Sequence, residues 1–160
     1  MKHIVGVGDM KLSKEAGDLL VTHALGSCLG VAVHDPVAGV GGLLHVMLPQ
    51  SSINPEKAEA NPFMFVDSGV PTFFHQLYAA GAAKPRCVVM VAGGGNVQGG
   101  DCDRFAIGKR NYLMLRKMLW KNGVLIKAAD VGGSAPRTMY LEIGSGRTWL
   151  STAGAELQLQ

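Results

Sequence analysis

Charged residues and long apolar runs are both scarce in this sequence, and each scarcity excludes a class of protein. Charged side chains make up 17% of the 160 residues, and the formal net charge is only +3. A charge this small, scattered along the chain, does not indicate a nucleic-acid-binding surface. No apolar run reaches the roughly 18 residues of a membrane-spanning helix, so we expect no membrane insertion. Aliphatic residues, in contrast, are abundant, which argues against disorder.

Cysteine is also scarce. The chain has three cysteines, an odd number without the spacing of metal ligands, which indicates reduced thiols and no disulfide framework. The N-terminal segment Met1–Val7 runs directly into Gly8-Asp9 and a series of charged residues, so it lacks the apolar segment of a secretory signal. We therefore expect a cytoplasmic protein.

The length suits one domain, residues 1–160, without a linker or an internal repeat. Helical patterning predicts helices over about Val70–Ala80, capped by Asp67 or Ser68, and over about Ile107–Lys121. Lys11–Asp18 is expected to be a loop or one turn of helix, Pro49–Pro62 a mobile surface loop, and Ala153–Gln160 a loose tail. Strands are expected at His3–Val7, Leu19–His23, Leu29–His34, Leu43–Leu48, Cys87–Ala92, Val124–Asp130, Arg137–Ile143 and Arg147–Thr152. Two long helices among about eight strands predict an α/β (α+β) fold, a layered sandwich of mixed, largely antiparallel sheets.

The segment Val21–Pro49 is predicted to form the central hairpin. Its turn is expected at Asp35-Pro36 and the glycines at 39, 41 and 42. If the turn centres after Pro36, Cys28 and His45 face each other; a register shift of two leaves them diagonal, about 7–8 Å apart. Gly30 and Ala32 share this sheet face, so we expect an open pocket there, while Val31 and Val33 point to the opposite face.

A cysteine beside a histidine is a candidate nucleophile. The imidazolium favours the thiolate, which attacks carbonyl carbon, so we expect rapid alkylation of Cys28 near neutral pH. From this pair alone, an inert buried thiol beside a strand histidine stays an open alternative.

Several separate motifs resemble the chemoreceptor glutamine deamidase family, CheD, in the right order along nearly the whole chain. The motifs in the N-terminal half are Leu25-Gly26-Ser27-Cys28, Asp35-Pro36, Gly41-Gly42 and His45-Val46-Met47-Leu48-Pro49. The later motifs are Phe65-Val66-Asp67-Ser68, the segment FAIGKRN over Phe105–Asn111, and Asp130-Val131-Gly132-Gly133 followed by Arg137.

The resemblance implies a fold shared with toxin-type cysteine deamidases, and a hydrolase of the protein-glutamine glutaminase class. It would convert glutamines of methyl-accepting chemoreceptors to glutamate, with Cys28 as nucleophile and His45 as base. Thr22, six residues before Cys28, matches a family threonine that would orient the imidazole. The backbone around Gly26 and Ser27 would supply oxyanion and loop support. This chemistry needs no metal or organic cofactor.

Two other functions stay open at this point. The chain could be a non-catalytic regulator that binds receptors or a CheC-type phosphatase, or a different thiol hydrolase on the same scaffold. The family contacts the phosphatase near the glycine-rich segment 93–102, where this sequence departs from the family pattern.

The remaining candidates favour ordinary structural roles. Gly93–Gly100 lacks the lysine and hydroxyl residue of a phosphate-binding loop, so we expect a flexible loop. Cys87 is expected to be buried and inert. Cys102, between two aspartates, should have a raised pKa and no catalytic role.

Overall fold

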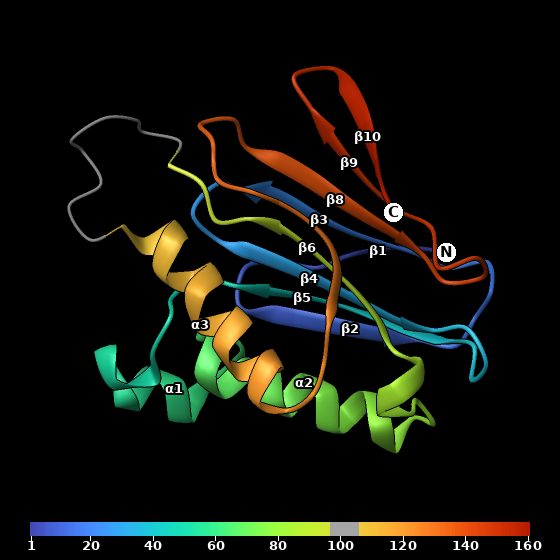
Figure 1. Ribbon diagram of the computed structural model, residues 1–160, viewed down its shortest axis with the longest axis horizontal. Helices are drawn as coiled ribbons and strands as arrows, with labels where there is room; N and C mark the ends of the chain where they lie inside the picture. The colour runs from blue at the N-terminus through green and yellow to red at the C-terminus, as the bar shows by residue number, and fades with distance from the viewer. Residues whose placement is uncertain (97–105) are drawn as a thin grey trace.

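Two five-stranded sheets pack face to face in the computed structural model, and helices cover the outer face of one of them (Figure 1). The structure describes residues 1–96 and 106–160. The first sheet has the order β1-β3-β8-β9-β10 and the second β2-β5-β4-β6-β7. The helices are α1 (Pro55–Ala60), α2 (Val66–Ala79) and α3 (Ile107–Lys121). The strands are β1 (Lys2–Ile4), β2 (Asp9–Ser13), β3 (Leu19–Leu25), β4 (Leu29–Asp35), β5 (Val40–Val46), β6 (Val88–Gly93), β7 (Ile126–Val131), β8 (Arg137–Glu142), β9 (Thr148–Thr152) and β10 (Ala155–Leu159).

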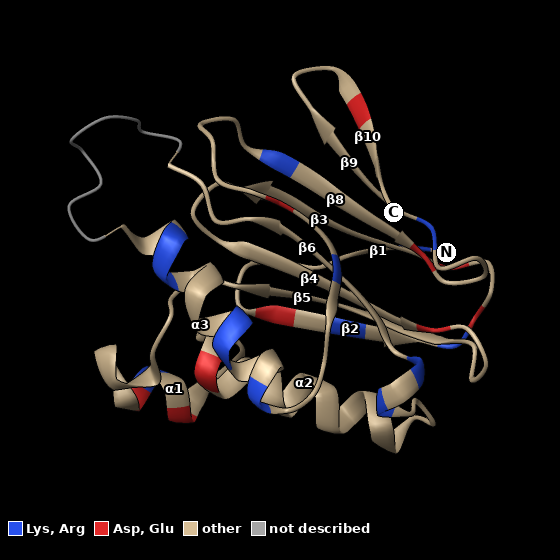
Figure 2. Ribbon diagram, in the orientation of Figure 1, with Lys and Arg blue, Asp and Glu red and all other residues tan. Residues whose placement is uncertain are grey.

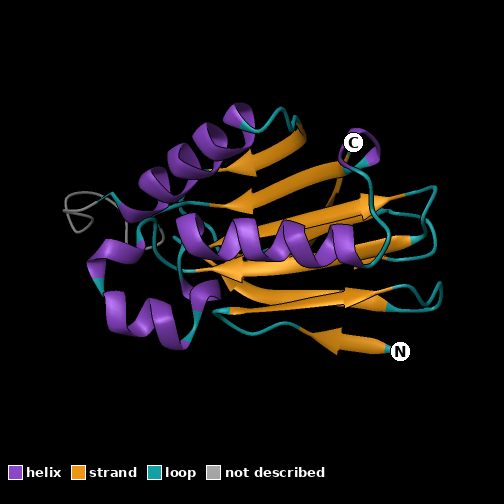
Figure 3. Ribbon diagram, turned by 90° about the horizontal axis from the view of Figure 1, so that it is seen from below, coloured by secondary structure: helices purple, strands orange, loops and turns teal. Residues whose placement is uncertain are grey.

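The second sheet is the middle layer, so its central strands are buried on both faces. One set of alternate residues, including Val31 and Leu44, packs under α2 and α3 with Phe73. The other set, including Ala32 and Leu43, packs against the first sheet. Figure 3 shows the two long helices lying across the outer face of the middle sheet. Burial on both faces explains why β4 and β6 are almost continuously apolar. The predicted fold class is confirmed, whereas the likeness to toxin-type deamidases stays a prediction.

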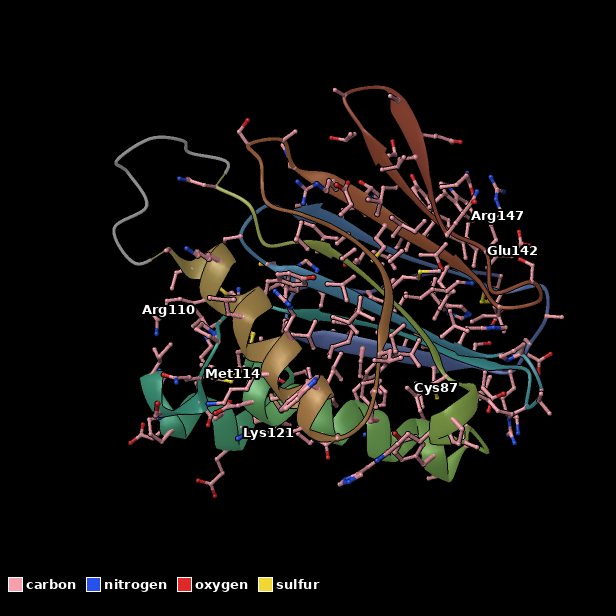
Figure 4. The ribbon with its side chains drawn as sticks, viewed as in Figure 1. Cys87, Arg110, Met114, Lys121, Glu142 and Arg147 are labelled. Carbon is pink, nitrogen blue, oxygen red and sulfur yellow. The ribbon has the colours of Figure 1, made fainter. Side chains whose placement is uncertain are left out.

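Helix α3 has the predicted bounds and a clear amphipathic pattern. Leu115 and Leu119 are buried against the middle sheet. Lysine and arginine recur along the outer side of the helix (Figure 2). Arg110 and Lys121 mark its two ends in Figure 4. No helix in the described part of the chain is both long and apolar enough to cross a membrane.

The β4–β5 hairpin has the longer of the two predicted turns. Gly30 pairs with His45, so Cys28 lies two residues beyond the position opposite His45. The Asp35 carboxylate accepts hydrogen bonds from the amides of Val37 and Ala38 and holds the turn. Gly41 and Gly42, predicted to be turn residues, are instead paired strand residues, and that prediction was wrong. A Cβ on Gly42 would lie 2.8 Å from the Phe73 ring, so the glycine lets α2 approach the sheet.

Three segments predicted to be irregular are ordered, and those predictions were wrong. Part of Lys11–Asp18 belongs to β2, which pairs with β5. The supposed loop Pro49–Pro62 contains α1, capped by the Asn54 side chain. The supposed loose tail, Ala153–Gln160, contains β10, which pairs with β9. Edge strands bind through their backbone and expose one face, so their sequences resemble loops.

Helix α2 begins four residues before the predicted start, at Val66. Neither Asp67 nor Ser68 caps it, because both residues lie inside its first turn. The Asp67 carboxylate instead accepts hydrogen bonds from the backbone and hydroxyl of Ser51. This contact attaches the segment after β5 to the helix.

Replacing Gly42 with alanine should destabilise the protein. The added Cβ would meet the Phe73 ring and Leu12 Cδ2, 2.5 Å away, and overpacking of this kind costs about 1–3 kcal/mol. Gly17→Ala is the matched control, because no atom lies within 4 Å of its Cβ position. Urea unfolding of both variants tests this, and equal midpoints would contradict the packing argument.

Candidate active site

The two sheets meet at a hydrogen bond between Thr22 and His45. His45 lies on β5 with its side chain fully buried between the sheets, and Thr22 lies on β3, also fully buried. The Thr22 Oγ1 atom is 2.6 Å from His45 Nδ1. The same hydroxyl oxygen is 2.7 Å from the carbonyl oxygen of Val5. The structure therefore joins two of the predicted catalytic residues directly.

This pair of contacts determines which tautomer His45 adopts. A carbonyl oxygen only accepts, so the single hydroxyl proton of Thr22 is donated to Val5. Thr22 Oγ1 must then accept the proton of His45 Nδ1. Nε2 consequently carries the free lone pair. It is buried and has no hydrogen-bond partner among the described residues, so it is available as a base.

Burial keeps both Cys28 and His45 uncharged. Desolvation lowers the pKa of His45 to about 4 and raises the pKa of the Cys28 thiol. The expected thiolate–imidazolium pair is therefore not the resting state, because the layer between the sheets disfavours charge. Rapid alkylation of Cys28 near neutral pH is accordingly no longer expected. In this structure His45 Nε2 makes no hydrogen bond with Cys28, which lies two residues from the position opposite His45.

Cys28 is half-buried and packs against the apolar cluster between the sheets. The expected open pocket beside Gly30 is filled, which corrects that prediction. A Cβ on Gly30 would lie 2.9 Å from both Leu25 Cδ1 and Met139 Sδ. Side chains of the first sheet thus occupy this face next to the hairpin.

The loop before Cys28 is held by its carbonyl groups. The Gly26 carbonyl accepts from the Gly95 amide at 2.8 Å, and the Cys28 carbonyl from the Gly94 amide at 2.9 Å. The Ser27 carbonyl accepts from Asn111 Nδ2 at 2.9 Å. All three carbonyl groups of the loop are therefore paired.

The amides of this loop make only local contacts. The Gly26 amide donates to Ala24 at 3.0 Å, so Gly26 supports the loop and is no oxyanion donor. The Ser27 amide donates to no backbone carbonyl within the described ranges, and the Cys28 amide interacts with the thiol of its own residue. In a trans peptide the N–H points away from the preceding carbonyl oxygen. These two amides thus point away from the groups that hold the loop.

Gly93, the last residue of β6, and the two glycines that follow it pack closely against the Cys28 loop and α3. The expected flexible loop is therefore wrong for Gly93–Gly95. A Cβ on Gly93 would lie 2.1 Å from the Cys28 carbonyl oxygen, and one on Gly108 would lie 2.3 Å from the Gly95 carbonyl oxygen. Arg137, buried on β8, donates to the Gly93 carbonyl at 2.7 Å. Cys102 and most of the segment 93–102 lie outside the described residues.

The other candidate residues lie away from the site. Cys87 precedes β6, at the opposite end of that strand from Gly93 (Figure 4), and burial raises the pKa of its thiol. His34 is buried, with Nε2 2.8 Å from the Ile143 carbonyl oxygen. No group of three or more residues suited to a metal ion occurs in the described ranges. Asn111, the last residue of the FAIGKRN segment, contacts the Ser27 carbonyl of the Cys28 loop, and the sequence pattern does not predict this contact.

The fold and site define a class: two-sheet α+β proteins in which a threonine and a histidine from different sheets lie next to a cysteine loop. A sequence profile described as "CheD chemotactic sensory transduction" matches residues 47–152. The chain belongs to the CheD family.

Curated relatives extend the similarity over the candidate site, whose Thr22, Cys28 and His45 precede the segment that the profile matches. A "Probable chemoreceptor glutamine deamidase CheD 1" from Syntrophus aciditrophicus is 46% identical over 97% of this chain and 96% of its own. A "Probable chemoreceptor glutamine deamidase CheD" from Solibacter usitatus is 46% identical over 98% of this chain and 92% of its own. A relative of the same name from Pyrococcus abyssi is 35% identical over 89% of this chain and 86% of its own.

The stability of the protein should depend on pH through His45. Its pKa is about 4 when folded against 6.5 for the free side chain, so below pH 6.5 only the unfolded state gains a proton. The free energy of unfolding should therefore fall as pH drops from 6.5 to about 4, by about 1.4 kcal/mol per unit.

Urea unfolding of wild type and His45→Gln between pH 7 and 5 tests this. The variant has no buried imidazole, so the difference in unfolding free energy between the two proteins should change with pH. A difference that is constant across this range would contradict the assignment.

Proposed function

We propose that this protein is a chemoreceptor glutamine deamidase, a cysteine-dependent protein-glutamine glutaminase. It converts specific glutamines of methyl-accepting chemoreceptors to glutamate and releases ammonia. The observation that carries the proposal is the Thr22–His45 bond, which leaves a buried lone pair on Nε2 of a histidine whose opposite strand position, Gly30, is two residues from Cys28. The printed names of the relatives support the substrate class. A cytoplasmic location belongs to the same proposal.

The first half of the reaction forms a thioester. His45 Nε2 takes the Cys28 thiol proton, and the sulfur bonds to the carboxamide carbon while the carbonyl electron pair moves to oxygen. The amides of Ser27 and Cys28 donate to this oxyanion. The imidazolium then protonates the nitrogen, the C–N bond breaks and ammonia leaves. Catalytic hydrogen bonds are often long without substrate, so the Cys28–His45 contact forms in the complex.

The second half releases glutamate. His45 Nε2 takes a proton from water, and the hydroxide oxygen bonds to the thioester carbon. The C–S bond then breaks, and the sulfur regains its proton from the imidazolium. His45 thus acts as base and acid in each half, a contribution of about 10²–10⁴-fold in rate. Thr22 holds the ring so that Nε2, and not Nδ1, exchanges protons.

Binding of a CheC-type phosphatase stays a prediction. The segment expected to make that contact, 93–102, lies mostly outside the described residues. Within the described part, Gly93, Gly94 and Gly95 are occupied by contacts with the Cys28 loop and α3.

Cys28→Ala should abolish deamidation, because the thioester of the proposed mechanism forms on the Cys28 sulfur. Cytoplasmic fragments of a candidate receptor, incubated with the protein, should gain about 1 Da per converted glutamine in a mass spectrum. Cys87→Ala is the matched control and should retain full turnover. Normal turnover by Cys28→Ala would refute the mechanism.

Thr22→Val should lower kcat by about tenfold or more while the protein stays folded. Valine has the shape of threonine but no oxygen, so Nδ1 loses its acceptor and the tautomer is no longer fixed. Thr138→Val is the control, because its hydroxyl contacts only the exposed His23, at 3.3 Å. Equal kcat values for the two variants would reduce Thr22 to a packing role.

A further inference from the structure

Asn111 lies in the first turns of α3 and its side chain is fully buried. Its Nδ2 atom is 2.9 Å from the Ser27 carbonyl oxygen and 3.0 Å from the Met47 carbonyl oxygen. Ser27 precedes the proposed nucleophile, and Met47 follows β5 two residues after the proposed base. One carboxamide therefore connects the two chain segments that carry the reaction.

The orientation of this carboxamide follows from its partners. Two carbonyl oxygens can only accept, so the nitrogen must face both, and both of its hydrogens are used. The Oδ1 atom is consequently buried without a hydrogen-bond partner among the described residues. An unsatisfied buried acceptor destabilises a fold. Asparagine at this position thus supplies two donors from one atom at a cost in stability.

The contact with Ser27 controls the direction of a catalytic group. The Ser27 carbonyl and the Cys28 amide belong to one planar peptide, and they point in opposite directions. When Asn111 holds the carbonyl oxygen, the Cys28 N–H points away from α3 and interacts with the thiol of its own residue. The contact with Met47 holds the end of β5 against the same group.

Gly108 explains how α3 comes close enough. It lies one turn before Asn111 on the same side of the helix. A Cβ there would lie 2.6 Å from the Gly94 carbonyl oxygen, so only glycine lets the helix rest on this backbone.

We propose that Asn111 is a positioning residue of the deamidation reaction, which orients the Cys28 amide as an oxyanion donor by holding the Ser27 carbonyl. This inference rests on the proposed function. Asn111 touches no reacting atom. Its effect is confined to the tetrahedral intermediate and the transition states on either side of it, because negative charge develops on the substrate oxygen only there.

The test compares wild type, Asn111→Ala and Asn122→Ala on a receptor fragment. Asn122 is the control, since its side chain is exposed at the end of the same helix and donates to the Met118 carbonyl at 2.7 Å. In Asn111→Ala, kcat should fall about 10²–10³-fold, as when an oxyanion donor is lost, and KM should change less than about twofold. Asn122→Ala should match wild type.

Alkylation of Cys28 separates positioning from collapse of the site. Iodoacetamide reacts at a saturated carbon and forms no oxyanion, so its rate at Cys28, followed against pH by peptide mass spectrometry, should be unchanged in Asn111→Ala. Alkylation that changes as strongly as kcat would make Asn111 a merely structural residue. Wild-type kcat in Asn111→Ala would also overturn the inference. If wild type releases no ammonia, the proposed function itself fails.

A second variant decides the matter if Asn111→Ala does not fold. Asn111→Asp keeps the shape but faces the two carbonyls with a carboxylate, which gains an O–H donor only when protonated. Its kcat should therefore rise as pH falls from 8 towards 5, whereas wild-type kcat should not. A pH profile parallel to that of wild type would refute the positioning role.

Discussion

The hydrogen bond between Thr22 and His45 is the constraint on which the site depends, because it crosses from one sheet to the other. The hydroxyl can accept from the ring only while its own proton goes to Val5. Val5 is held in turn, because its amide donates to the Val21 carbonyl of β3 at 2.7 Å. The packing of the two sheets therefore sets the protonation of a single ring nitrogen.

The Cys28 loop shows a second use of backbone hydrogen bonding. The Gly95 and Gly94 amides, together with the Asn111 side chain, take up its three carbonyl groups. Arg137 of β8 donates a hydrogen bond to the carbonyl of Gly93, next to the glycines that contact this loop. Strands of both sheets and one helix thus contact the loop that precedes β4. Because each N–H points opposite to the carbonyl of the preceding residue, the Ser27 and Cys28 amides point away from the groups that bind the Gly26 and Ser27 carbonyls. An oxyanion needs backbone amides that are oriented in this way.

Exclusion of water decides which kind of thiol chemistry the site supports. Burial raises the pKa of Cys28 and lowers the pKa of His45, so an ion pair is disfavoured before substrate binds. A neutral imidazole with a fixed tautomer is suited to general-base catalysis, in which the proton moves as the sulfur attacks. The resting thiol is thereby kept from reacting with other electrophiles.

The sequence by itself determined the features that depend on short chain separations: the β4–β5 hairpin, the bounds of α3, and the shared sheet face of Cys28 and His45. These follow from periodicity and turn chemistry. The edge strands β2 and β10 escaped sequence reasoning, because backbone pairing leaves their side chains polar. Only the tertiary structure decided the tautomer of His45 and the contacts of Asn111. Both depend on contacts between distant segments, such as Ser27 with Asn111, and packing alone sets those distances.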